Sequence, residues 1–262
     1  MPRRIVIHAG FHKTGTSTVQ AVLRGNRAAL RPFLRSVLKG EIEPLCHAAR
    51  GYSTWRDPFT LDKFAARFAA LLDRVGAMPK RVLCLSAEEL AGHMPGRAGI
   101  ADYGAALELA REMARVAESR APGTPVAFYY STRTPQDWLE SAYWEHVKSS
   151  AMTLDFADFA ARHRAAADLD AMAERIAAEL PVTRIRLEDS RAHPAGPAGP
   201  LLDLCGVPRR AQAALRLPPP VNERRDARVL LELLAANRDY TDRDARRAAK
   251  RAILAAAQET SR

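Results

Sequence analysis

The stretch GFHKTGTST at residues 10–18 decides the fold of this chain. It follows the short apolar run IVIH at residues 5–8, which is typical of a buried parallel strand. It precedes apolar residues at helical spacing, namely Val19, Val22, Leu23 and Leu30. A strand, a glycine-containing loop and a helix in this order direct backbone N–H groups and a helix N-terminus at a phosphate. The sequence therefore predicts a phosphate-binding loop.

The loop departs at one position from the G-x-x-x-x-G-K-[ST] loop of nucleotide hydrolases. Gly10 and Gly15 have the spacing of that motif, but the next residue is Thr16 instead of lysine. The nearest ammonium group belongs to Lys13, three residues earlier. The alternative is a plain strand-to-helix turn in which Thr16 or Ser17 caps the helix. Because capping and phosphate binding use the same geometry, the turn does not exclude the function.

A second strand is predicted over residues 126–131, and the sequence TRTPQD follows it directly. Thr134 suits the N-cap of a helix and Pro135 its first position, so we expect a helix through about residue 148. Arg133 then lies at the carboxyl end of a strand, where open α/β sheets bind ligands. Ser141 follows two turns into the helix, so the guanidinium and the hydroxyl can converge on one phosphate.

These two segments resemble sulfotransferases that use 3′-phosphoadenosine 5′-phosphosulfate (PAPS). Bacterial members carry H-x-K-T-G-T-[ST] in the 5′-phosphosulfate loop, which here lacks the spacer after His12, and R-x-P-x-D-x-x-x-S-x-Y in the 3′-phosphate element. The resemblance covers residues 5–30 and 126–148; elsewhere only the order of elements agrees. It implies an α/β fold, a parallel P-loop-like sheet flanked by helices with further C-terminal helices. It also implies that PAPS is bound by His12, Lys13, Thr14, Gly15, Thr16, Ser17, Thr18, Arg133 and Ser141.

The activity implied is transfer of a sulfuryl group from PAPS to a hydroxyl or amine, with release of the desulfated nucleotide (PAP). Lys13 offsets the charge that develops on the bridging oxygen as the donor bond breaks. The acceptor stays open between sugar, amine, lipid head group, phenol and peptide. A carbohydrate or a small metabolite is our expectation. The rival interpretations are a nucleotide-dependent kinase or NTPase, a catalytically silent nucleotide-binding protein and a basic nucleic-acid binder.

A base is expected after a third strand at residues 81–86. Glu88 and Glu89 follow that strand, and we favour Glu88 because adjacent side chains diverge and only one can face the ligand. The alternative is that both carboxylates interact with a helix dipole. His12 and His93 are rival bases. Ser86 stands where an NTPase commonly carries an aspartate for Mg²⁺, and no pattern with metal-ligand spacing is found, so we expect no metal.

Composition fits one domain over residues 1–262, with residues 220–262 as a C-terminal helical accessory. The formal charge of +10 suits an anionic nucleotide, and with 6% aromatic residues we expect no nucleic-acid partner. Three widely spaced cysteines indicate reduced thiols and a cytoplasmic protein. A first strand near residue 5 leaves no room for a signal peptide, and no apolar run is long enough to span a membrane.

The remaining elements follow from periodicity and from glycine and proline breaks. Loops are predicted over residues 40–60 and 91–104, and Tyr52 and Trp55 in the first of these either face an acceptor or pack in the core. Arg224 and Arg225 occupy a region that in relatives often closes over the nucleotide. A fourth strand is predicted at residues 182–187. Helices are predicted near 61–75, 104–119, 155–180, 201–205, 225–237 and 242–258.

Overall fold

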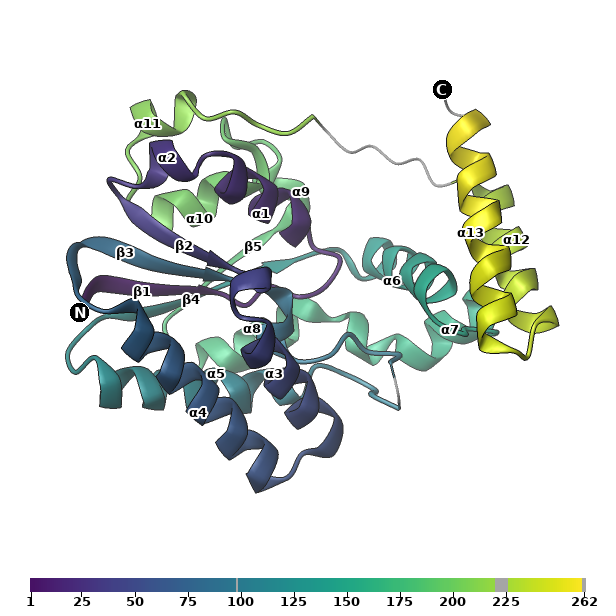
Figure 1. Cartoon of the computed structure of the whole chain (residues 1–262), viewed down its shortest axis with the longest axis horizontal. Helices are drawn as coiled ribbons and strands as arrows, with labels where there is room; N and C mark the ends of the chain where they lie inside the picture. Colours follow the sequence, from purple (N-terminus) through teal and green to yellow (C-terminus); the bar gives the residue numbers. More distant parts are fainter. Residues whose placement is uncertain (98, 220–225, 261–262) are drawn as a thin grey trace.

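The structure is a computed structural model that describes residues 1–97, 99–219 and 226–260. Five parallel strands form one sheet in the order β2-β3-β1-β4-β5, and helices cover both of its faces (Figure 1). The predicted α/β class with a parallel sheet and flanking helices is confirmed. The strands are β1 Pro2–His8, β2 Leu34–Leu38, β3 Met78–Ser86, β4 Val126–Thr132 and β5 Val182–Arg186.

The central part of β1, residues 5–7, is apolar because both faces of the sheet are covered there. Successive side chains of a strand point to opposite faces, so Ile5 and Ile7 join one hydrophobic core and Val6 joins the other. All three side chains are fully buried. A strand buried on both faces therefore shows a continuous apolar run instead of alternation.

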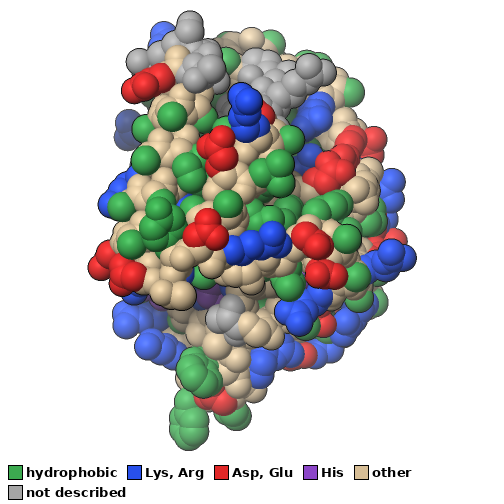
Figure 2. Space-filling model, turned by 90° about the vertical axis from the view of Figure 1, so that its right-hand side faces the viewer, with side chains coloured by type: hydrophobic (Ala, Val, Ile, Leu, Met, Phe, Trp, Pro, Cys, Tyr) green, Lys and Arg blue, Asp and Glu red, His purple; other side chains and the backbone are tan. Residues whose placement is uncertain are grey.

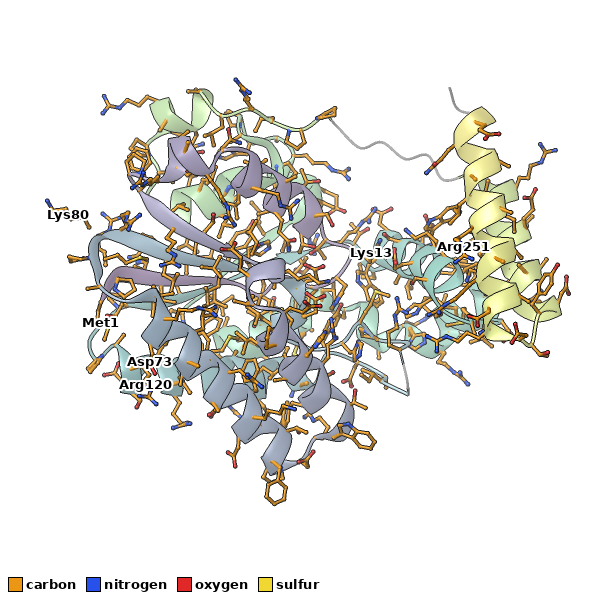
Figure 3. All side chains as sticks on the ribbon, in the orientation of Figure 1. Met1, Lys13, Asp73, Lys80, Arg120 and Arg251 are labelled. Carbon is orange, nitrogen blue, oxygen red and sulfur yellow. The ribbon has the colours of Figure 1, made fainter. Side chains whose placement is uncertain are left out.

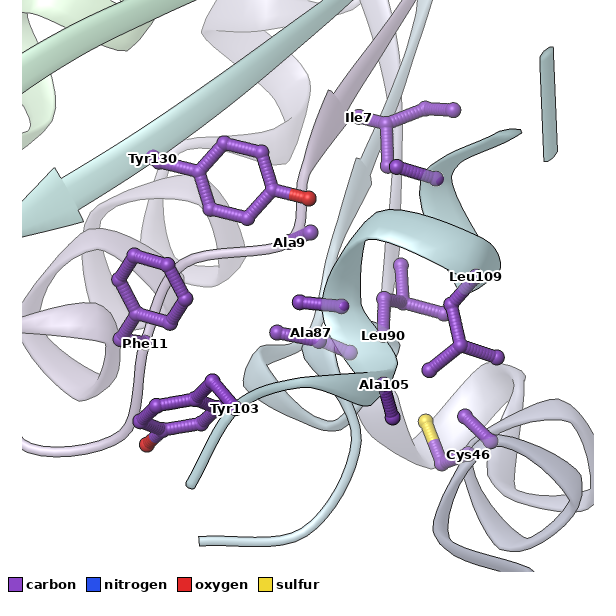
Figure 4. Packing of buried hydrophobic residues seen from close by; sticks show 14 of the residues in the cluster. Ile7, Ala9, Phe11, Cys46, Ala87, Leu90, Tyr103, Ala105, Leu109 and Tyr130 are labelled. Carbon is purple, nitrogen blue, oxygen red and sulfur yellow. The ribbon is translucent and has the colours of Figure 1, made fainter. Parts of the chain in front are cut away.

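The larger core lies under α3 Glu43–Trp55, α4 Pro58–Val75, α5 Ala105–Arg120 and α8 Leu169–Ala177. Buried aromatic side chains extend this core to Phe11, in the loop after β1 (Figure 4). The Phe11 ring lies 4.7 Å from that of Tyr103 and 5.1 Å from that of Tyr130, measured between centroids. These contacts hold the start of the loop against the sheet.

The smaller core is covered by the N-terminal helices and by segments that follow β5. Val19, Val22 and Leu23 of the first helix pack there, as the helical spacing predicted. The helices on this side are α1 Thr16–Gly25, α2 Arg27–Leu30, α9 Leu187–Ser190, α10 Gly199–Leu204 and α11 Arg209–Ala213. The 3₁₀ helices of the chain are η1 Lys39–Glu41, η2 Glu88–Ala91, η3 Ala165–Ala167 and η4 Gly196–Ala198.

The last two helices, α12 Ala227–Asp239 and α13 Arg243–Thr260, form a hairpin beside α6 Pro135–Ser149 and α7 Phe156–His163 (Figure 1). Basic and acidic side chains are interspersed on this side of the molecule (Figure 2). Lys250 of the hairpin is buried and donates to the carbonyls of Val147 and Ser150, at 2.6 and 2.8 Å. The hairpin thus satisfies carbonyl groups at the end of α6, which a helix leaves without intrahelical partners.

Two sequence predictions differ from the structure, and one strand was not predicted. Residues 40–60 are not a loop: Pro44 lies in the first turn of α3, where proline is tolerated, and Gly51 lies inside the helix. Strand β2 was not predicted, and η3 divides the helix predicted over residues 155–180 into two.

Tyr52 packs in the core and Trp55 is exposed. Arg224 and Arg225 lie outside the described residues.

The helices that the structure describes include none long and apolar enough to cross a membrane. Cys46, Cys84 and Cys205 are free thiols, and all three are buried. Burial raises the pKa of the Cys46 thiol to about 12. Since the thiolate is the reactive form, this thiol is a packing group and not a nucleophile.

Candidate functional site

A cavity of about 940 Å³ opens at the carboxyl ends of the strands, at the upper end of the range for small-molecule sites. The segments that line it follow β1, β2, β3, β4 and β5, so the sheet gathers distant parts of the sequence at one edge. Lys13 lies at this edge, between the sheet and α6 (Figure 3). The predicted residues in its lining are His12, Lys13, Gly15, Thr16, Ser17, Thr18, Glu88, Glu89, His93, Arg133 and Ser141.

The loop after β1 is tightly packed and contains two residues with positive φ. Gly15 has φ +86° and Lys13 has φ +68°, a region that non-glycine residues seldom occupy. A Cβ atom on Gly10 would lie 2.7 Å from Cγ2 of Thr16, so only glycine fits there. The N-cap of α1 is Gly15 and no side chain caps the helix, so the alternative of a Thr16 or Ser17 cap is wrong. Thr16 and Ser17 line the cavity instead.

Hydrogen bonds from the surrounding structure fix the loop through its carbonyl groups. The Thr14 hydroxyl donates to the carbonyl of Phe11 at 2.6 Å and lies 2.7 Å from the hydroxyl of Ser131 on β4. Nε1 of Trp138 donates to the carbonyl of His12 at 2.9 Å. Thr14, predicted as a ligand residue, is not part of the cavity lining and fastens the loop to β4.

Lys13 and Glu145 form an ion pair across the cavity, with Nζ and Oε2 3.1 Å apart. Burial raises the pKa of Glu145, but the ammonium groups of Lys13 and Lys148 outweigh that effect and lower it to about 2. Glu145 is therefore ionised at neutral pH. It lies one turn after Ser141 on α6, a position that sequence reasoning did not select.

Arg133 joins the second predicted segment to the first. Its Nη1 donates to the carbonyl of Lys13 at 3.3 Å. Its Nε lies 3.8 Å from Oε1 of Glu188 and is buried without a hydrogen-bond partner among the described residues. The predicted cap is confirmed, because the Thr134 hydroxyl accepts a hydrogen bond from the N–H of Asp137. Arg133 and Ser141 thus line the same cavity as Lys13.

Glu88 and Glu89 both line the cavity, whereas we expected only one to face it. Nε2 of Gln20 donates to Oε2 of Glu88 at 2.8 Å. Glu89 is buried, and its Oε1 is bound by both Lys39 and Arg50, the latter at 3.4 Å. The two carboxylates therefore differ in environment: one is held by a neutral amide, the other by two cations.

The two histidine candidates are poor bases in this setting. Burial first, then the nearby cations and His93, lower the pKa of His12 to about 3. Burial, Arg50 and Arg97 lower the pKa of His93. The Tyr103 hydroxyl accepts from the N–H of His12 at 3.0 Å and lies 3.1 Å from its Nδ1. A neutral His12 serves the loop mainly by this contact.

Five charged residues of the lining were not predicted as site residues. They are Lys39, Arg50, Arg97, Glu145 and Arg191. Lys39 directly follows strand β2, which was not predicted either, so its place at the sheet edge was not visible. Across the parts of the chain that are described, no group of three or more His, Cys, Asp or Glu side chains is placed to hold a metal ion.

The sequence has no match among protein-family models and none among curated proteins. Its function must therefore be argued from the geometry of the cavity.

Proposed function

We propose that this protein transfers a sulfuryl group from PAPS to a hydroxyl or amine of an acceptor molecule. One observation carries the proposal: Lys13, Arg133 and Ser141 line a single cavity of about 940 Å³ together with the loop of residues 15–18. A nucleotide with phosphate at both its 5′ and 3′ positions needs two groups of anion-binding residues, and we assign these to the loop and to Arg133 with Ser141.

The 5′ side of the donor is assigned to the loop. Helix α1 begins there, and the first N–H groups of a helix have no intrahelical partners and favour an anion. Gly10 and Gly15 allow close approach of the backbone. The 3′-phosphate is assigned to Arg133, whose buried Nε lacks a hydrogen-bond partner among the described residues, and to the Ser141 hydroxyl.

The sheet supports the same assignment. The order β2-β3-β1-β4-β5 places the loop strand in the centre, with β4 and its Arg133 directly beside it. This topology is compatible with the P-loop-like sulfotransferase fold, which we assign to the chain as part of the proposal. The ligand then lies outside the carboxyl ends of the strands, as in other open α/β sheets.

In the proposed reaction the acceptor oxygen or nitrogen forms a bond to sulfur. The bond between sulfur and the bridging oxygen of the 5′-phosphate breaks, and PAP leaves. The proton of the acceptor passes to a carboxylate, for which we assign Glu88. Glu88 accepts a hydrogen bond from the amide group of Gln20, whereas the carboxylate of Glu89 is already paired with Lys39 and Arg50. Lys13 offsets charge on the leaving oxygen.

A P-loop kinase or NTPase is the alternative function that would use the same loop between a strand and a helix. Its motif places the lysine directly after the second glycine, where this chain has Thr16. Lys13 lies before Gly15 and has the left-handed backbone conformation, so its side chain leaves the loop at a different point. A silent nucleotide-binding protein would share every contact described above, and only turnover separates it from an enzyme.

The proposal is tested by incubating the protein with ³⁵S-labelled PAPS and a panel of sugars, amines, phenols, lipids and peptides. Mass measurement then identifies any sulfated product. We expect label transfer to one acceptor class, and loss of transfer in Lys13→Ala. Thermal shift with PAP and with ATP–Mg²⁺ separates the rivals: stabilisation by ATP–Mg²⁺ alone would favour the kinase. Stabilisation by PAP without label transfer would favour the silent binding protein.

A further inference from the structure

The cavity has a second group of cations, on the side away from the proposed 3′-phosphate site. In the sheet order β2-β3-β1-β4-β5, Arg133 and Arg191 follow β4 and β5. On the opposite side of the loop, Lys39 follows β2 and Arg50 projects from α3, and Arg97, which follows η2, reaches Ser149 at the end of α6. The loop after β1 separates the two groups. If PAPS occupies the loop and the β4 side, the β2–β3 side is left for the acceptor.

Carboxylates on this side do not neutralise the cations. Lys39 and Arg50 share one partner, Oε1 of Glu89. Arg97 forms no ion pair within the described ranges, and its Nη2 donates to the neutral hydroxyl of Ser149 at 2.6 Å. Three cations thus face two carboxylates, Glu88 and Glu89, and one of these is assigned as the base.

The effect of this charge is visible at the neighbouring histidines. After burial, Arg50 and Arg97 are the groups that lower the pKa of His93. Both guanidinium groups therefore lie close enough to His93 to lower its pKa. His93, Lys39 and Arg97 also lower the pKa of His12, with burial again the larger cause. A positive potential within a partly enclosed cavity favours an anionic ligand.

The segment that carries Arg97 is held in a fixed conformation. The N–H of Arg97 donates to the carbonyl of Met94 at 3.3 Å, and the N–H of Ile100 donates to the carbonyl of Arg97 at 2.8 Å. Gly96 has φ +90°, and a Cβ atom there would lie 2.7 Å from Nε2 of His146. Nε2 of His146 also lies 2.7 Å from the carbonyl of Pro95. These contacts fix the backbone of Arg97, and its hydrogen bond to Ser149 places the guanidinium near the end of α6.

We infer that the β2–β3 side of the cavity is an anion subsite, formed by Arg97 and Arg50 beside His93, and that the acceptor carries a phosphate, sulfate or carboxylate group in addition to its attacking hydroxyl or amine. The assignment to the acceptor rests on the proposed function, because PAPS must occupy the other side. A guanidinium pairs with each of these three anions through parallel N–H donors. The subsite positions the acceptor, and its residues take no part in bond breaking.

The test is isothermal titration of the PAP-saturated protein with sodium phosphate, sodium sulfate and sodium acetate, at ionic strength held constant with chloride. We expect one anion to bind in the subsite at millimolar concentration. PAP fills the two phosphate sites but leaves the place of the transferred sulfuryl group beside Lys13 empty, so a bound anion is assigned to the subsite only if Arg97→Gln weakens its binding. The order of the three anions then identifies the acceptor group. We expect Arg97→Gln to weaken this binding by about tenfold or more, as for loss of one charge-assisted pair. PAP affinity should change by less than about twofold, because Arg97 lies outside the donor side.

Arg67→Gln is the matched control, since Arg67 is exposed on α4 and outside the cavity lining. It should leave both PAP and anion binding unchanged. If none of the three anions binds the PAP complex, or if one binds equally well to Arg97→Gln, the inference is wrong. Failure of PAP itself to bind would instead contradict the proposed function, so the two failures are distinguishable.

Discussion

The ammonium of Lys13 and the carboxylate of Glu145 are 3.1 Å apart, so the cation of the phosphate loop is paired with an acid from helix α6. Both groups line the cavity. A dianionic ligand that binds beside Lys13 therefore competes with Glu145 for the same ammonium group. The pair therefore sets the charge that the loop would present to the proposed nucleotide.

Replacing Glu145 with glutamine should tighten the binding of PAP. The substitution removes a negative charge that lies next to the proposed phosphosulfate site and leaves the shape unchanged. Because both side chains are about one-fifth exposed, we expect a gain of roughly threefold to tenfold, about 1 kcal/mol, which falls as salt is raised. Titration calorimetry measures it. Glu140→Gln, at an exposed position of the same helix, is the control and should have no effect. Weaker PAP binding in Glu145→Gln would show that the carboxylate orients Lys13 for the ligand.

Lys13→Ala should lower the rate of sulfuryl transfer by on the order of 10²–10³-fold, the range for removal of one well-placed charged donor. PAP affinity should fall by less, since the loop N–H groups and Arg133 stay in place. Single-turnover assays with ³⁵S-PAPS measure the rate. Circular dichroism confirms that the variant is folded. A rate equal to that of the unchanged protein would remove Lys13 from the mechanism.

Substitution of Glu88 should affect turnover, whereas substitution of Glu89 should affect stability. Glu88→Gln should lower turnover by about 10²-fold or more, as for loss of a general base, with little change in stability. Glu89→Gln leaves Lys39 and Arg50 without their shared carboxylate, and we expect it to lower the free energy of unfolding by about 1–3 kcal/mol. Urea unfolding and turnover, measured on both variants, make the comparison. If Glu89→Gln abolished turnover without loss of stability, the base would be Glu89.

Lys250→Met should loosen the C-terminal hairpin from α6. The ammonium donates to the carbonyls of Val147 and Ser150 and to Oδ1 of Asn237. The substitution removes this donor from all three acceptors, of which only the Val147 carbonyl keeps another donor among the described residues, Nδ2 of Asn237. We expect a loss of about 2–3 kcal/mol. Amide hydrogen exchange should accelerate in α12 and α13 while β1 and β3 stay protected. Arg251→Met, at the exposed neighbouring position (Figure 3), is the control. Unchanged exchange in Lys250→Met would mean that apolar contacts alone dock the hairpin.

Local chemistry explains which parts of the fold the sequence predicts. Strands β1, β3 and β4 each contain a short buried apolar run, and Thr134 and Pro135 form a recognisable helix start, so these strands and the start of α6 were predicted. Helix α3 was missed because Pro44 and Gly51 indicate breaks, while the buried face of Leu45, Ala49 and Tyr52 that forms the helix depends on tertiary packing. Local signals do not report such packing.

Local sequence signals likewise predict only part of the site. The loop and Arg133 were predicted because each follows a strand in a motif with defined spacing. Lys39 and Arg50 gave no such signal: their place in the cavity depends on β2, on α3 and on the shared contact with Glu89. Arg97 lies in residues 91–104, which were predicted only as a loop. Arg97 is a candidate anion-binding residue because it has no ion-pair partner among the described residues, and no sequence pattern encodes that property.

The central claim is that one nucleotide places its two phosphate ends at Lys13 and at Arg133, and the most direct test compares PAP with adenosine 5′-phosphate. Titration calorimetry on the unchanged protein should show PAP binding more tightly by about 10- to 100-fold, because adenosine 5′-phosphate lacks the 3′-phosphate. In Arg133→Gln that difference should nearly vanish, while the affinity for adenosine 5′-phosphate stays the same. Equal affinity of the unchanged protein for the two nucleotides would contradict the account.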